Sequence, residues 1–239
     1  MAVNINNLGA RALSPLAGGL PLRIMPLGAS ITYGQASSDG NGYREALRSQ
    51  LVEGGNAVNM VGSRQHGTMH DNNVEGWPGA VIETVHSKAQ ASVPQYKPNV
   101  VLVNAGTNDC LGNLNMTGVG DRMQSLIDDV WNLSPKATVV LSSLLVNKGP
   151  AAERNVLDAN AQFAAVATKL QAQGRHVVFV DMHTTDGPLA SDLVDSTHPN
   201  DAGYRKMAAI WYAGLVEASN AGWIVPADPV PGLKDDGSI

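Results

Sequence analysis

The sequence predicts an α/β protein, a three-layer α/β/α sandwich in which a five-stranded parallel sheet lies between two layers of helices. Short apolar runs recur along the chain, and they are nearly continuous in Val, Ile and Leu instead of alternating with polar residues. That pattern is typical of parallel strands that are covered on both faces. Longer amphipathic segments separate the runs, so the chain consists of repeated βα units joined by right-handed crossovers.

Each expected strand is followed by an expected helix. Glycines or prolines close several of the helices: Gly54 and Gly55 end the first, Pro94 follows the second, Pro135 follows the third, and Gly174 ends the fourth. In such a sheet the ligand site lies beyond the carboxyl ends of the strands. The strands are predicted at 22–27, 57–62, 100–105, 138–145 and 176–182, and the helices at 42–54, 80–93, 117–133, 151–174 and 200–220.

Length and composition favour a single domain over residues 1–239, with a core at about 20–222 and extended ends at 1–19 and 225–239. The net charge of -5 and the dispersed Lys and Arg residues argue against nucleic-acid binding. No apolar run approaches the ~20 residues of a membrane span. We expect a monomer. Sequons at Asn115 and Asn132 suit a secreted protein, although a cytoplasmic location stays open.

Two segments at opposite ends of the chain carry groups suited to acyl transfer. In P-L-G-A-S-I-T-Y-G, Ser30 follows the end of the first strand, where a turn exposes its hydroxyl and its own amide. In D-S-T-H-P-N-D, Asp195 precedes His198 by three residues, a spacing that lets the carboxylate orient the imidazole. A serine hydroxyl needs such a base to become a nucleophile. Taken alone, Ser30 is a helix-cap or turn serine. The alternative role for His198, an N-terminal helix residue that satisfies local amides, is disfavoured by Asp195 upstream.

Two further segments offer donors for a developing oxyanion. V-N-A-G-T-N-D follows the third strand and presents Asn108, which is otherwise a residue that closes an Asx-turn. E-G-W-P-G follows the second strand and presents the amide of Gly79, with Gly76 as a competitor. Together with the amide of Ser30, these donors predict an oxyanion hole. No metal and no organic cofactor is expected.

With these four segments in view, the chain resembles the SGNH, or GDSL, hydrolase family, whose blocks fall here on Ser30, Gly79, Asn108, and Asp195 with His198. The resemblance implies the flavodoxin-like topology of SGNH hydrolases and a carboxylic ester hydrolase with a catalytic triad and an oxyanion hole. The I-M-P-L-G and D-N-N-V-E-G-W-P-G stretches are similar to carbohydrate esterase family three, whose acetylxylan esterases deacetylate xylan. One departure is Ala29, which stands where the G-D-S block has Asp.

The expected substrate is therefore a small-molecule or polysaccharide ester, with acetylated xylan as the leading example. Tyr33, Trp77 and Thr107 are candidate substrate-binding residues beside these blocks, and core packing is an equal alternative for Trp77. Cys110 has no basic neighbour in sequence and is expected to be structural. A lipase or lysophospholipase, and a member of the fold that binds carbohydrate without turnover, remain the alternative functions.

Overall fold

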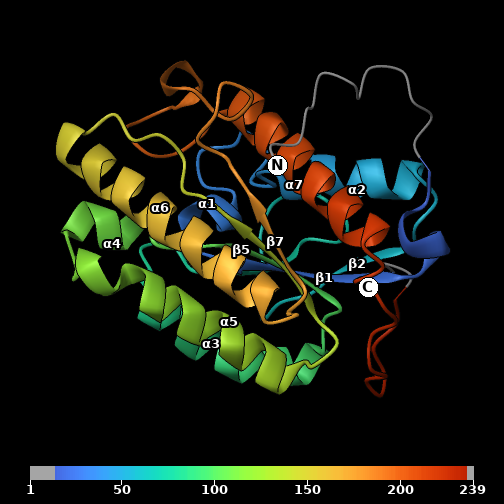
Figure 1. Ribbon diagram of the computed structural model, residues 1–239. Helices are drawn as coiled ribbons and strands as arrows, with labels where there is room; N and C mark the ends of the chain where they lie inside the picture. Colours follow the sequence, from blue (N-terminus) through green and yellow to red (C-terminus); the bar gives the residue numbers. More distant parts are fainter. Residues whose placement is uncertain (1–13, 236–239) are drawn as a thin grey trace.

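A computed structural model describes residues 14–235, which form a parallel-rich sheet with helices on both faces (Figure 1). The sheet has seven strands in the order β3-β4-β1-β5-β6-β7, and β2 pairs with β1 outside this path. The α/β sandwich predicted from the sequence is therefore confirmed. The strands are β1 (Leu22–Gly28), β2 (Val58–Met60), β3 (Arg64–Gln65), β4 (Asn73–Gly76), β5 (Val100–Asn104), β6 (Thr138–Ser142) and β7 (Val177–Val180).

The predicted number of strands, five, is too small. All five predicted strands form, and they are parallel in the order β2-β1-β5-β6-β7. The two additional strands are β3 and β4, which pair antiparallel with each other, while β4 also pairs parallel with β1. Both are short and contain polar residues, so neither produces an apolar run.

The helices lie in two layers, with α2 and α7 on one face of the sheet and α3, α5 and α6 on the other (Figure 1). Alternate strand residues supply the two cores: Leu102 packs in the α2 and α7 layer, and Val103 packs in the opposite one. The helices are α1 (Ser30–Tyr33), α2 (Arg44–Glu53), α3 (Ile82–Tyr96), α4 (Thr107–Gly112), α5 (Val119–Leu133), α6 (Pro150–Ala172) and α7 (Asp201–Asn220), with short 3-10 turns at Leu16–Gly19, Met116–Gly118 and Ala190–Asp192.

The end of α3 differs from the prediction. Pro94 lies inside this helix, which continues to Tyr96 and is closed by Lys97 in the left-handed region. A proline in the last turn removes one backbone donor but does not stop a helix that is already packed on the core, as Val93 is. The short helices α1 and α4 were also not predicted. Each has fewer residues than apolar periodicity needs to become visible.

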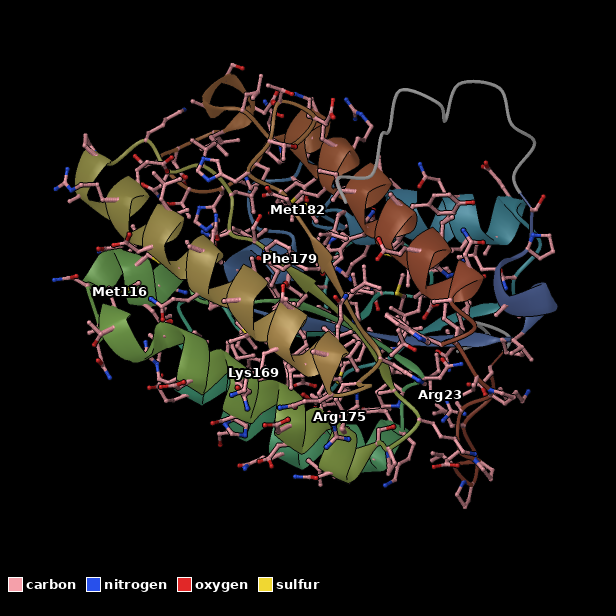
Figure 2. The ribbon with its side chains drawn as sticks, in the orientation of Figure 1. Arg23, Met116, Lys169, Arg175, Phe179 and Met182 are labelled. Atoms are coloured by element: carbon pink, nitrogen blue, oxygen red, sulfur yellow. The ribbon has the colours of Figure 1, made fainter. Side chains whose placement is uncertain are left out.

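The chain ends are better attached than the sequence suggests. Residues 1–13 and 236–239 lie outside the described part, while Leu16–Gly19 forms a 3-10 turn whose Leu16 is buried. The segment from 225 to 235 has no helix or strand, but it is not loosely held. It covers the buried Arg23, whose guanidinium binds both carboxylate oxygens of Asp235 at 2.7 and 2.6 Å and the Asp228 carbonyl at 2.8 Å (Figure 2).

Among residues 14–235, no helix combines the length and the apolar character that crossing a membrane requires.

Candidate active site

Ser30 begins the short helix α1, directly beyond the carboxyl end of β1. Gly28 ends that strand, and a side chain there would collide with the Asn104 carbonyl oxygen on β5. The chain can therefore pass close to β5 before it turns into α1. Ser30 is buried, with 8% of its surface exposed.

The hydroxyl of Ser30 meets His198 from the opposite end of the chain. His198 Nε2 lies 2.9 Å from Ser30 Oγ, and His198 Nδ1 lies 2.7 Å from Asp195 Oδ2. The second carboxylate oxygen of Asp195 accepts the backbone N–H groups of Thr197 and His198, both at 2.7 Å. These contacts form one continuous chain of hydrogen bonds from carboxylate to imidazole to hydroxyl, which is the arrangement of an acyl-transfer triad.

Asp195 is held in its ionised form. Partial burial acts to raise its pKa, but the N–H groups of His198 and Thr197 and the imidazole of His198 more than offset this and lower the pKa to about 2. The carboxylate therefore remains available to orient the imidazole at neutral pH and well below it. Its side chain is 53% exposed, compared with 14% for His198, so the imidazole is the more sheltered partner.

The loop that carries Asp195 is fastened to the segment after β6. Lys148 donates its backbone N–H to the Ser196 carbonyl at 3.0 Å and its ammonium to the Leu193 carbonyl at 2.9 Å. Asn147 donates its side-chain amide to Thr197 Oγ1 at 3.0 Å. Three bonds from one short segment thus fix a loop that has no regular secondary structure next to the carboxylate.

Gly79 and Asn108 follow the carboxyl ends of β4 and β5, the two strands that pair with β1 at Gly28. Trp77 donates its backbone N–H to the Gly28 carbonyl at 3.0 Å, which places the following loop against the end of β1. Asn108 Nδ2 donates to the Ala80 carbonyl at 2.8 Å, so the amide of Asn108 is tied to the residue after Gly79. The arrangement brings both predicted donors to the carboxyl ends of the strands, where Ser30 also lies.

Gly79 fits the predicted role better than Gly76 does. Gly79 is exposed in the loop and has φ +79°, a conformation that L side chains rarely adopt. Gly76 is buried at the end of β4, in register with Gly28. An exposed amide is available to a ligand, whereas Gly76 is part of the sheet.

The sequence analysis did not identify Asp109, which fixes this loop from beneath. Its fully buried carboxylate accepts the N–H of Ile82 at 3.0 Å and an N–H of Arg122 at 2.9 Å. Burial raises the pKa of Asp109, and the bonds from Arg122 and Ile82 act in the opposite direction. Neighbouring residues of α4 therefore clamp both sides of the loop, Asn108 through Ala80 and Asp109 through Ile82. The sequence carries no signal of this role, because both partners of Asp109 are distant along the chain.

The sequence profile of the GDSL-like lipase/acylhydrolase family matches residues 27–206, a span that includes every one of these residues. The chain belongs to this family. The resemblance to SGNH and GDSL hydrolases and the expected class, carboxylic ester hydrolases, are thereby confirmed.

Relatives of the chain include carbohydrate esterases. A family 3 carbohydrate esterase of Clostridium thermocellum has a similar structure, with a TM-score of 0.74, 27% identity, and coverage of 84% of this chain and 98% of that one. A family 3 carbohydrate esterase from Talaromyces cellulolyticus, at 20% identity and a TM-score of 0.73 over 84% of this chain and 99% of that one, shows the same fold. The multidomain esterase of Ruminococcus flavefaciens is 29% identical over 92% of this chain, which spans 32% of that longer protein.

Ala29 is this chain's departure from the family's G-D-S block. Ala29 is buried and occupies the N-cap position of α1, where no side chain accepts a hydrogen bond from the helix. The Ser30 turn nevertheless forms, because the N–H of Tyr33 bonds to the Ala29 carbonyl at 3.0 Å and Gly34 bonds to the Ser30 carbonyl at 3.1 Å. The backbone alone closes the turn that a capping Asp would reinforce.

The three candidate substrate-binding residues of this GDSL-family chain lie beside the triad but differ in availability. Tyr33 ends α1 and stacks on His66 with ring centroids 3.8 Å apart. Trp77 donates its indole N–H to Glu75 at 2.7 Å and packs on the core, while Arg64 and Lys88 lie over its ring, so its contacts favour the packing alternative. Thr107 begins α4, half-buried, next to Asn108.

Cys110 contributes no nucleophile at this site. The thiol is buried, and burial followed by the charge of Asp109 raises its pKa to about 12. A thiol in this state is almost entirely protonated at neutral pH.

Proposed function

We propose that the chain is a serine esterase that hydrolyses carboxylic esters through an acyl-enzyme and removes acetyl groups from a carbohydrate. One observation carries the proposal: the unbroken hydrogen-bond chain from Asp195 through His198 to the hydroxyl of Ser30. The geometry matches the functional roles of a nucleophile, its general base and the group that orients the base.

In the first half-reaction, Ser30 Oγ attacks the carbonyl carbon of the ester and transfers its proton to His198 Nε2. The carbonyl π electrons move onto oxygen, and the amides of Ser30 and Gly79 and the side chain of Asn108 stabilise the resulting oxyanion. When the tetrahedral intermediate collapses, the bond from carbon to the alcohol oxygen breaks. The leaving alcohol takes the proton from His198, and the acyl group remains on Ser30 as an ester.

In the second half-reaction, water attacks the acyl-enzyme and gives its proton to His198. Collapse of the second tetrahedral intermediate breaks the bond between the acyl carbon and Ser30 Oγ, which recovers the proton. The carboxylic acid leaves, and the enzyme returns to its starting state. Asp195 stabilises the imidazolium that forms twice in this cycle, because it is ionised across the working pH range.

The carbohydrate substrate is supported by the relatives, since the Clostridium thermocellum structure is a family 3 carbohydrate esterase and is 27% identical. Acetylated xylan is the specific substrate we propose. The family also includes lipases, so acyl chain length is the property that separates a deacetylase from a lipase or lysophospholipase.

The test measures hydrolysis of p-nitrophenyl acetate by the wild-type protein and by Ser30→Ala. We expect kcat of Ser30→Ala to fall by ~10³ or more, because loss of a triad member leaves only the contribution of the other groups. Ser87→Ala is the matched control, since Ser87 is an exposed serine on α3. An active Ser30→Ala protein overturns the proposal, and an inactive but folded wild type identifies a non-catalytic binding protein.

A second measurement addresses the substrate. Release of acetate from acetylated xylan is compared with hydrolysis of p-nitrophenyl butyrate and octanoate by the same preparation. We expect the rate to fall as the acyl chain lengthens, and acetate to be released from xylan. A preference for octanoate refutes the deacetylase assignment and leaves the triad assignment standing.

A further inference from the structure

Beside the triad, the edge of the sheet formed by β3 and β4 carries a cluster of basic and aromatic side chains. The Arg64 guanidinium carbon lies 4.6 Å from the centre of the Tyr33 ring and 4.7 Å from that of Trp77. Lys88 Nζ lies 4.1 Å from the centre of the Trp77 ring, and His66 stacks on Tyr33. We call these five residues the basic-aromatic cluster.

The charges of this cluster are not neutralised by the part of the protein that the structure describes. Within residues 14–235, Arg64 donates to the Gly76 carbonyl at 3.1 Å, and neither Arg64 nor Lys88 forms an ion pair with a carboxylate. The adjacent acid, Glu75, is buried and is already bonded to Ser63 and Trp77. A guanidinium has several N–H donors, so most of those on Arg64 are available to a ligand.

The local electrostatics agree with this description. Burial lowers the pKa of His66, and the positive charges of Arg44 and Arg64 lower it further. By contrast, Arg48 is paired with Asp71 at 2.8 Å. Arg64 thus contributes a positive charge without a direct carboxylate partner among residues 14–235, in a chain whose net charge is -5.

The cluster adjoins the place where the ester must bind. Tyr33 is the last residue of α1, the helix that starts with Ser30. Trp77 is bonded through its N–H to the end of β1 and precedes Gly79 by two residues. A group held by Arg64 would therefore lie in the neighbourhood of α1, the helix that Ser30 begins.

We propose that Arg64, with Tyr33, forms a subsite for a carboxylate-bearing sugar residue, so that the preferred substrate is an acetylated oligosaccharide containing a uronic acid. The guanidinium supplies paired donors that match a carboxylate, and the Tyr33 ring, 4.6 Å from the guanidinium carbon, helps to hold Arg64 in place. This inference rests on the proposed function. It identifies a specificity residue, Arg64, that lies outside the four family blocks.

The experiment compares kcat/KM for two acetylated oligosaccharides of matched length, one neutral and one with a uronic acid. We expect the wild type to prefer the acidic substrate by about two- to fivefold at low salt, the worth of a solvent-accessible ion pair, and less at ~0.5 M NaCl. Arg64→Gln should bring the ratio to about one, and Arg64→Lys should restore part of it because the charge returns without the paired donors.

Arg175→Gln is the matched control. Arg175 also lies over an indole ring, that of Trp131 at 5.1 Å. It precedes β7, at the amino end of the strand, whereas Met182 follows the carboxyl end of the same strand (Figure 2). Its substrate ratio should equal that of the wild type. A ratio that is already one in the wild type, or one that survives Arg64→Gln, overturns the inference.

Binding separates failure of this inference from failure of the proposed function. Calorimetry with Ser30→Ala protein measures the affinity for the deacetylated acidic and neutral oligosaccharides, without any turnover. A preference for the acidic ligand that Arg64→Gln removes supports the subsite even if no esterase activity is found. If inorganic phosphate competes at Arg64 as strongly as the uronic oligosaccharide binds, the site is a general anion site and the proposal is wrong.

Discussion

Replacing Asn108 tests the oxyanion side of the site most directly. One N–H of its side chain is used in the 2.8 Å bond to the Ala80 carbonyl, which leaves the second for the substrate. Asn108→Ala therefore removes one oxyanion donor together with one tie on the Gly79 loop. Loss of such a donor costs about 3–4 kcal/mol in the transition state, or ~10²–10³ in kcat. KM should change much less, because the donor acts on charge that develops during the reaction.

Asn108→Asp should be more severe although it keeps the shape of the side chain. It removes the same donor, costing about 3 kcal/mol, and adds a carboxylate near the oxyanion. At an effective dielectric constant of about 20, appropriate to a half-buried group, two negative charges about 4 Å apart repel by about 4 kcal/mol. The sum of about 7 kcal/mol corresponds to a loss of ~10⁵ in kcat.

The assay is steady-state hydrolysis of p-nitrophenyl acetate, with kcat and KM determined separately and the fold checked by thermal melting. Asn132→Ala, at an exposed asparagine on α5, is the control. The reasoning is refuted if folded Asn108→Ala keeps kcat within about threefold of the wild type, or if the loss falls entirely on KM. It is also refuted if the Asp variant is more active than the Ala variant.

Three further outcomes follow from the geometry. Asp195→Asn should lower kcat by ~10² or more. The pKa of Asp195 is about 2 in the folded protein and ~3.9 in the unfolded chain, so its carboxylate stabilises the fold above about pH 4, and this stability is lost as the pH falls toward about 2. The free energy of unfolding in urea should therefore depend less on pH in that range for the variant than for the wild type. Asp235→Asn should destabilise the fold by about 1–3 kcal/mol in chemical denaturation, since it removes the counter-ion of the buried Arg23. The esterase activity of this variant should equal that of the wild type. The control is Asp186→Asn, at an exposed site, which should leave the stability unchanged. Ala29→Asp should change kcat/KM by less than about threefold because it adds a cap to a turn that already forms, and a loss above about tenfold would contradict that account.

The apolar strands and the long helices could be predicted because each produces a local pattern. The run 100–103 is hydrophobic at every position, because successive residues such as Leu102 and Val103 pack in opposite layers. The candidate triad was also accessible, because Ser30 and the D-x-x-H segment are contiguous motifs with recognisable chemistry. The structure adds the contact between them, which joins residues 168 positions apart.

Other features could not be predicted because their partners are distant in sequence. In the sequence, Asp109 cannot be distinguished from an exposed aspartate on a surface helix. Only its bonds to Ile82 and Arg122 show that it fixes the Gly79 loop. Arg64 is likewise an ordinary strand-edge arginine until Tyr33 and Trp77 are placed around it. Neither arrangement leaves a periodic or spaced signal.

Of the two strands that the sequence analysis missed, β4 is the one that leads to Gly79, the proposed oxyanion donor. β1 pairs with β2 over Leu22–Ile24, and its other half, at Leu27 and Gly28, pairs with β4 on the same edge. The exchange of partners requires β4 to pass very close to Gly62, where any side chain would collide with the backbone of Val74 and Glu75. Because β4 then ends beside Gly28, the loop that follows carries Gly79 to the same end of β1 as Ser30. The candidate nucleophile and its proposed oxyanion donor are therefore carried to the same end of β1 by one strand with two successive neighbours, an arrangement that depends on a glycine at position 62, outside the site.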